Sequence, residues 1–115
     1  LVNDFCLKKK KILISAAISK FEAHIFNFNF SEKIPCYRCF MPEIPELENK
    51  CDSEGILPTV AGIAGTIQAN EVVKSILKKK NDLVGKMIVF NTLSLNFRKI
   101  ILTRNTGCIK ICNKR

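Results

Sequence analysis

The chain has 115 residues, of which 47% are hydrophobic and 25% are charged, and its formal net charge is +9. This length accommodates one ordinary domain, and the composition is typical of globular proteins and not of disordered chains. The longest apolar stretch, residues 56–69, is shorter than the roughly 20 residues that span a bilayer, and no signal peptide is recognisable. We therefore expect a soluble, cytoplasmic protein with no membrane partner.

The positive charge does not by itself indicate a nucleic-acid partner. Lysines form two runs, residues 8–11 before an apolar stretch and residues 78–80 after a predicted helix. Lysines at the end of a helix interact favourably with its dipole and keep the segment soluble. We interpret both runs as solvated and expect no nucleic acid to bind.

Two strands are predicted near the start of the chain. Residues 11–18 (KILISAAI) are continuously apolar, which predicts a buried strand. Residues 24–30 (HIFNFNF) alternate, with phenylalanines on one face and Asn27 and Asn29 on the other, so they predict a half-buried strand that pairs with the first. His24, the only histidine, has no nucleophile beside it in a catalytic pattern, and we interpret it as structural.

The segment IPCYRCF places Cys36 and Cys39 in a C-x2-C pair, which can bind a metal or form a redox disulfide. A redox pair needs a helix that lowers the thiol pKa, and Pro42 and Pro45 oppose a helix at this place. The redox interpretation is therefore the weaker of the two.

A second pair, Cys108 and Cys112, has C-x3-C spacing near the end of the chain. Two distant pairs predict a tetrahedral zinc site with four thiolates, which would join the end of the chain to its middle. Arg38 and Lys110 would offset the negative charge of such a site. Reduced cysteines without a metal remain the alternative, and Cys6 is expected to be a small buried hydrophobe.

The remaining residues predict a loop, a long helix and two more strands. Residues 41–55 are rich in proline and acidic residues and contain Cys51, and a helix is predicted from Pro58 to the lysine run. Gly62 and Gly65 lie inside that helix, where they favour close packing over a phosphate-binding loop, because no Gly-x-Gly turn follows a strand. Residues 85–91 and 96–102 predict an antiparallel pair of strands.

Taken in order, six segments resemble the C-terminal half of the ThiF/MoeB/HesA family, relatives of the ubiquitin-activating enzymes. They are LVNDFC, ISAAISKFEAHIFNF, PCYRCF, CDSEGILPTVAGIAGTIQANEVVKSIL, GKMIVFNTLSLNFRKIIL and GCIKIC. Within the family the resemblance is greatest to the molybdopterin-synthase adenylyltransferases (MoeB type). It implies an α/β protein with a partial ThiF-type Rossmann-like fold: a mixed or antiparallel sheet, one long helix and a zinc-stapled C-terminal hairpin.

The resemblance also implies a function. The family uses ATP, with Mg²⁺, to adenylate the C-terminal glycine of a ubiquitin-fold sulfur carrier in molybdopterin or thiamine biosynthesis. By resemblance, the four paired cysteines are ligands of a structural Zn²⁺, and Cys51 occupies the place where some members carry a reactive, catalytic cysteine and other members function without one. The metal ligands so implied are Cys36, Cys39, Cys108 and Cys112.

Three departures from the family pattern bear on this expectation. The last pair is C-x3-C where C-x2-C is usual, and Ala23 stands where glycine is usual. The family's nucleotide machinery, including its Gly-rich turn, phosphate-binding Arg and Lys and magnesium-binding Asp, has no counterpart in these 115 residues.

We therefore expect residues 1–115 to form the C-terminal part of a ThiF/MoeB-type domain, without the nucleotide-binding half. Alone it would be an inactive part of an adenylyltransferase that needs a separate N-terminal half or a homodimer. The alternative is a zinc-stabilised, non-catalytic binding module for a ubiquitin-like partner. In either case residues 11–18 are expected to form an exposed sheet edge.

Overall fold

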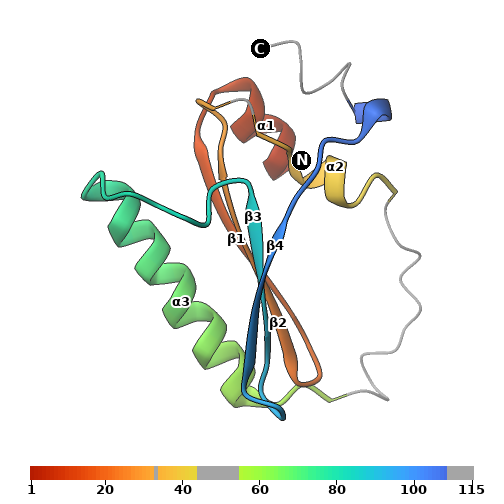
Figure 1. Cartoon of the computed structure of the whole chain (residues 1–115), viewed down its shortest axis with the longest axis vertical. Coiled ribbons are helices and arrows are strands. Elements are labelled where there is room, and N and C mark those ends of the chain that lie inside the picture. Colours follow the sequence, from red (N-terminus) through yellow and green to blue (C-terminus); the bar gives the residue numbers. More distant parts are fainter. Residues whose placement is uncertain (33, 44–54, 109–115) are drawn as a thin grey trace.

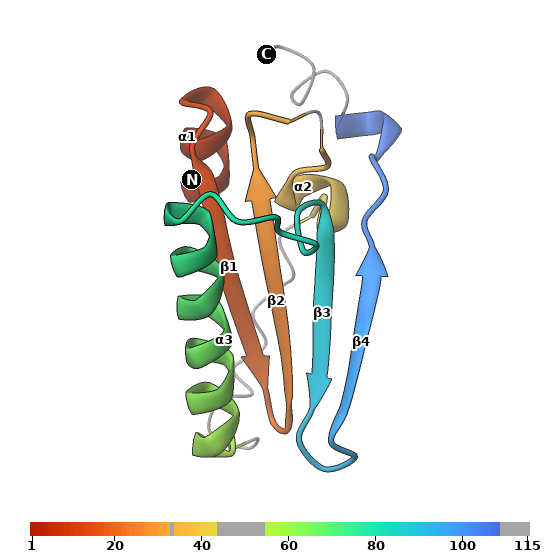
Figure 2. The same ribbon diagram turned by 60° about the vertical axis from the view of Figure 1, so that its left-hand side comes forward.

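A four-stranded antiparallel sheet organises the computed structural model, which describes residues 1–32, 34–43 and 55–108. The strands lie in the order β1-β2-β3-β4, and one long helix crosses one face of the sheet (Figures 1 and 2). The elements in chain order are α1 (Val2–Lys8), β1 (Ile12–Ser19), β2 (Glu22–Asn29), α2 (Tyr37–Phe40), α3 (Pro58–Ile76), β3 (Lys86–Asn91), β4 (Asn96–Ile101) and a 3-10 turn, η1 (Thr106–Cys108).

Two hairpins build the sheet, as the sequence predicts. β1 pairs with β2 with Ala16 opposite Ile25, and β3 pairs with β4 with Phe90 opposite Phe97. β2 and β3 are also antiparallel neighbours, so the second hairpin continues the sheet that the first one starts. Of the two predicted alternatives, mixed or antiparallel, the named strands form an antiparallel sheet.

Helix α3 begins at Pro58, as predicted, because proline fits the first helical turn, where its missing N–H leaves no bond unmade. Val60 and Ala64 are almost fully buried against Ala23 of β2, which forms a small core between helix and sheet. The predicted close packing at Gly62 and Gly65 is wrong for the described residues. Both are exposed, and a Cβ on either would meet nothing within 4 Å, because the helix turns Val60 and Ala64 toward the sheet instead.

The larger core lies on the opposite face of the sheet, where α1 and α2 pack. Phe26 and Phe28 of β2 are at most 1% exposed there, beside Leu7 and Met87. β2 is thus covered on both faces, and Asn27, on the α3 side, is also only 1% exposed. The prediction of a half-buried β2 is therefore wrong, because a sequence pattern cannot reveal that a helix 30 residues later covers the polar face.

Two further expectations need correction. β1 is not a buried strand: among the described strands it pairs only with β2, and its residues are half-buried or exposed because it forms a sheet edge. The C-x2-C pair does lie on a helix, because one turn, α2, begins at Tyr37 between the two cysteines and ends at Phe40 before Pro42. Helix α1 was not predicted at all.

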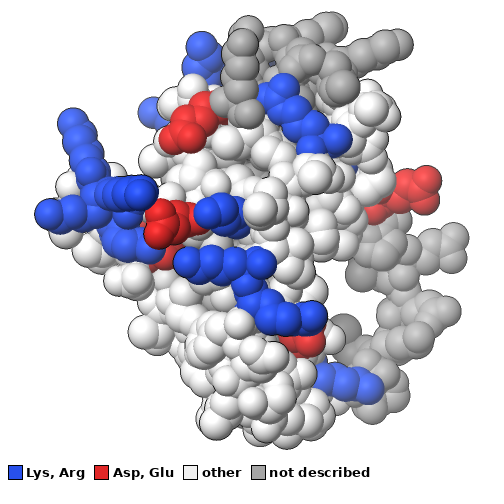
Figure 3. All heavy atoms as spheres, in the orientation of Figure 1, with Lys and Arg blue, Asp and Glu red and all other residues white. Residues whose placement is uncertain are grey.

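Charged side chains on the face shown in Figure 3 form separate groups, with acidic side chains beside several of the basic ones. Lys80 lies 4.0 Å from Asp82, and Lys74 forms an ion pair with Glu71. Within the described ranges, no helix has both the length and the hydropathy that a membrane crossing requires.

Candidate metal centre

Three of the four predicted metal ligands lie together. The sulfur of Cys36 is 4.0 Å from that of Cys39 and 3.6 Å from that of Cys108, and all three sulfurs lie within 4.8 Å of one another. The cysteines are buried, with exposed fractions of 0%, 8% and 6%, although Cys36 and Cys108 are 72 residues apart. The fold thus brings η1 to the C-x2-C turn.

These separations fit a metal better than a disulfide. A disulfide bond is about 2.05 Å long, whereas ligands at about 2.3 Å from a tetrahedral Zn²⁺ lie about 3.8 Å apart. The separations of the Cys36 sulfur from the Cys108 and Cys39 sulfurs, 3.6 and 4.0 Å, fall on either side of that value. Thiolates also suit soft or borderline ions. The three cysteines can therefore hold a metal ion.

The C-x2-C turn is fixed locally by one helical turn and by aromatic packing. Cys36 precedes α2, and the N–H of Cys39 donates to the carbonyl of Cys36 at 3.0 Å, so both sulfurs project from the same turn. Phe26 of β2 packs against Tyr37 and Phe40, with ring centroids 5.7 and 5.3 Å away. These contacts hold the turn against the sheet.

Cys108 is presented by a turn that begins at Asn105. The Asn105 side-chain oxygen accepts a hydrogen bond from the N–H of Gly107 at 2.8 Å, and its carbonyl accepts one from the N–H of Cys108 at 3.0 Å. This is the Asx-type turn that asparagine favours. Leu102, just after β4, is buried in the same core as the three cysteines. This burial fixes the chain just before the turn that carries Cys108.

Helix α1 contacts this site through two polar side chains. The Asn3 side-chain oxygen accepts the N–H of Tyr37 at 3.0 Å. The carboxylate of Asp4 accepts two bonds from Arg38, from Nε at 2.8 Å and from Nη2 at 2.7 Å. No local pattern in the sequence marks Asn3 and Asp4 as part of the site, because only the tertiary structure brings together positions 34 residues apart.

The Asp4–Arg38 ion pair shifts the pKa values of both side chains. The hydrogen bonds from Arg38 lower the pKa of Asp4 to about 2, from a usual value of 3.8. The hydrogen bonds to the Asp4 carboxylate, and then its negative charge, raise the pKa of the Arg38 guanidinium. Arg38 and Cys108 also line one depression of about 310 Å³. Arg38 thus pairs with Asp4 and lines the same depression as Cys108, and its role in offsetting the charge of a metal site stays a prediction.

The other predicted residues stand apart from this cluster or cannot be placed. Cys112, Lys110 and Cys51 lie outside the described residues. Cys6 is half-buried and packs against the same core as the three cysteines without joining their group. His24 hydrogen-bonds Glu22 at 2.7 Å on the sheet, in keeping with its interpretation as structural.

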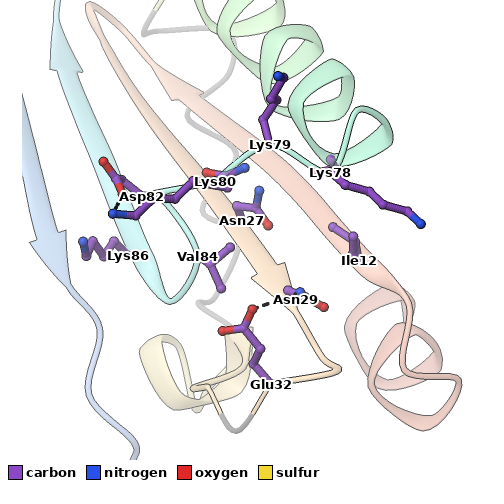
Figure 4. A pocket seen from close by; sticks show the side chains of 12 residues that line it. Ile12, Asn27, Asn29, Glu32, Lys78, Lys79, Lys80, Asp82, Val84 and Lys86 are labelled. Atoms are coloured by element: carbon purple, nitrogen blue, oxygen red, sulfur yellow. Dashed lines mark hydrogen bonds and ion pairs between the residues drawn. The ribbon is translucent and has the colours of Figure 1, made fainter.

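A second candidate region is a cavity of about 690 Å³ at the end of α3 (Figure 4). Four lysines contribute to its lining, but Lys78 and Lys79 point in different directions and Lys80 pairs with Asp82. Asn27, at its centre in the view, donates to the buried carboxylate of Glu71 at 3.4 Å. Because the lysines do not converge, this cavity lacks the arrangement of a phosphate site.

Comparisons with known proteins agree with the fold. The ThiF family model matches residues 1–110. The structure superimposes on the crystal structure of Escherichia coli MccB with a TM-score of 0.74 at 21% identity. That match covers 96% of this chain and 35% of MccB, and at this identity it shows a similar fold and nothing more.

Two sequence relatives are named as adenylyltransferases. An adenylyltransferase and sulfurtransferase MOCS3 of Dictyostelium discoideum is 34% identical over 100% of this chain and 28% of its own length. A molybdopterin-synthase adenylyltransferase of Salmonella typhimurium is 30% identical over 98% of this chain and 45% of its own length. The chain thus spans less than half of these relatives. Because the family model matches residues 1–110, the 115 residues belong to the ThiF family.

Proposed function

We propose that Cys36, Cys39, Cys108 and Cys112 hold one Zn²⁺ and that this ion is structural. The three described sulfurs have separations suited to a tetrahedral thiolate site, and Cys112 would supply the fourth ligand from the same tail as Cys108. They are buried in an apolar core beside Phe26 and Phe28, away from solvent. A closed set of four thiolates leaves no open position for substrate, so the ion would join β4's tail to the C-x2-C turn and take no part in the chemistry.

The chain as a whole would serve in an ATP-dependent adenylyltransferase that activates the C-terminal glycine of a ubiquitin-fold sulfur carrier, for molybdopterin or thiamine biosynthesis. The observation that carries this proposal is the match to the ThiF family over residues 1–110, together with relatives named as adenylyltransferases. ATP and Mg²⁺ would be held by groups outside these 115 residues. Gly62 and Gly65 of α3 form a Gly-x-x-Gly segment, but they lie inside a helix and do not form a phosphate-binding loop.

Exposed apolar surface on the sheet edge and on α3 supports the proposal that these residues function in contact with another part of the enzyme or with a second subunit. β1 pairs on one side only within the described sheet, and Val72, Val73, Ile76 and Leu77 near the end of α3 are 42–72% exposed. Contiguous exposed apolar surface of this kind commonly marks an interface. A nucleotide-binding portion of the enzyme, or a second subunit, would cover it.

ATP–pyrophosphate exchange in a chimera tests this function. The matched segment of the Salmonella relative is replaced by this chain, and exchange is measured with a ubiquitin-fold sulfur carrier. We expect exchange from the chimera and none from the 115 residues alone, because nothing in the described part neutralises a triphosphate. A carrier that lacks its terminal glycine is the control and should give no exchange.

A folded chimera that contains zinc but gives no exchange would contradict the enzymatic role. Carrier binding, measured by calorimetry on the same sample, then identifies the alternative: binding without exchange would mean a zinc-stabilised, non-catalytic binding module. Exchange from the 115 residues alone would mean that the nucleotide site lies in residues that we have interpreted as structural. Cys51→Ser in the chimera tests the proposed reactive cysteine, whose loss should slow a sulfur-transfer step and spare exchange.

A further inference from the structure

We propose that Asn3 and Asp4 of α1 are positioning residues for the metal centre, and that docking of α1 and binding of the metal strengthen each other. The proposal rests on the metal site proposed above and adds two residues that do not touch the ion. Both residues act on α2, the single helical turn that carries Cys39 and follows Cys36.

Asn3 completes the start of that turn. The first N–H groups of a helix have no partner within it, and Cys36, in the capping position, makes no side-chain cap. The oxygen of Asn3 accepts the N–H of Tyr37 at 3.0 Å and so supplies the missing cap from another helix. The backbone between the two cysteines is thereby fixed at its first residue.

Asp4 fixes the next residue. Its two oxygens accept from Nε and Nη2 of Arg38 at 2.8 and 2.7 Å, a two-point contact that sets the orientation of the guanidinium. Arg38 lines the same depression as Cys108, so its orientation determines where a positive charge lies beside the sulfurs. Outer contacts of this kind commonly change metal affinity by about 10- to 100-fold.

The coupling follows from the shortness of both helices. α1 has seven residues, of which only Leu7 is buried, and α2 has four. Helices below about 12 residues are marginal in water, so each depends on its contacts with the other and with the core. A metal ion that fixes the C-x2-C turn therefore also fixes the groups that Asn3 and Asp4 bind. The two events are thermodynamically linked. If docking of α1 raises the affinity for the metal by some factor, bound metal raises the equilibrium constant of α1 docking by the same factor.

Long-range charge predicts the opposite result, which makes the proposal testable. Zn²⁺ displaces the thiol protons, so the loaded site is more negative than the apo site. By charge alone, Asp4→Asn should leave zinc binding unchanged or tighter, and Asn3→Asp should weaken it more than Asn3→Ala. Positioning predicts weaker binding for Asp4→Asn, and it predicts that Asn3→Asp, which keeps an acceptor oxygen, binds more tightly than Asn3→Ala.

The test is zinc affinity of the full chain by competition with a chromophoric chelator at pH 7, with Co²⁺ spectra to report tetrahedral thiolate geometry. We expect about tenfold weaker zinc binding for Asn3→Ala and Asp4→Asn, with reduced Co²⁺ d–d intensity. Asn91→Ala is the matched control, because its oxygen also accepts backbone N–H groups, of Leu93 and Ser94, but in the β3-β4 turn. That variant should bind zinc as the wild type does.

Hydrogen exchange of the unmodified chain gives a second test that needs no variant to fold. The amides of Phe5 and Lys9, which donate within α1 and at its end, should exchange more slowly with zinc than after chelation. The proposal would be overturned if both positioning variants bound zinc with wild-type affinity, or if the exchange rates of the α1 amides were the same with and without zinc. Either result would leave the metal site itself intact. A wild-type chain that binds no zinc would overturn both.

Discussion

Removing the metal should cost the protein a large part of its stability. The proposed ion joins Cys108 to Cys36, which closes a loop of 72 residues. The chain-entropy argument for a disulfide gives about 4 kcal/mol for a loop of this length, and a metal cross-link restricts the unfolded chain in the same way. Because small domains are stable by about 5–15 kcal/mol, we expect chelation to lower the melting temperature by roughly 10–20 °C.

Thermal unfolding followed by circular dichroism, with and without a strong chelator, measures this loss. Cys108→Ser should lower the melting temperature of the zinc-containing sample by a similar amount and make it nearly insensitive to chelator. Cys6→Ser is the matched control, because Cys6 packs against the same core outside the sulfur cluster, and it should keep the chelator response. If chelation removes the zinc, as shown by metal analysis, and the melting temperature does not fall, the cross-link argument is refuted.

Three further predictions concern the fold around the centre. Phe28→Ala should lower the free energy of unfolding by about 4 kcal/mol, since Phe28 is fully buried between Phe26 and Phe30, whereas Phe97→Ala, at a side chain 57% exposed, should cost much less. Urea unfolding compares them, and similar losses would contradict the assignment of the core. Lys74→Met should cost about 3 kcal/mol, because it leaves Glu71, only 3% exposed, without its ion partner. The double variant with Glu71→Gln, which removes the charge but keeps an acceptor for Asn27, should recover most of that loss in the same assay, and no recovery would mean that Lys74 does not act through the charge of Glu71. Finally, the stability difference between wild type and Asp4→Asn should be full above about pH 4 and shrink toward pH 2, because the folded pKa of Asp4, about 2, lies below its usual 3.8. Metal-free samples are compared by urea unfolding from pH 6 to pH 3, and a pH-independent difference would show that the carboxylate charge is not involved.

Local sequence determined the elements whose signals lie within one stretch of chain. Alternation in residues 24–30 predicted β2, and Pro58 followed by small and apolar residues predicted the start of α3. These succeed because strand periodicity and helix capping are local properties of the backbone. The C-x2-C pair is also local, since one helical turn brings Cys36 and Cys39 to 4.0 Å.

Only the tertiary structure decided which residues meet across the chain. Cys108 reaches Cys36 because β4 runs back along the sheet, and Asn3 and Asp4 reach Tyr37 and Arg38 because α1 packs beside α2. Burial of Asn27 likewise depends on α3, which closes over a strand face that its own sequence marks as polar. Such contacts depend on how separate elements pack, and packing of distant segments leaves no periodic trace in either one of them.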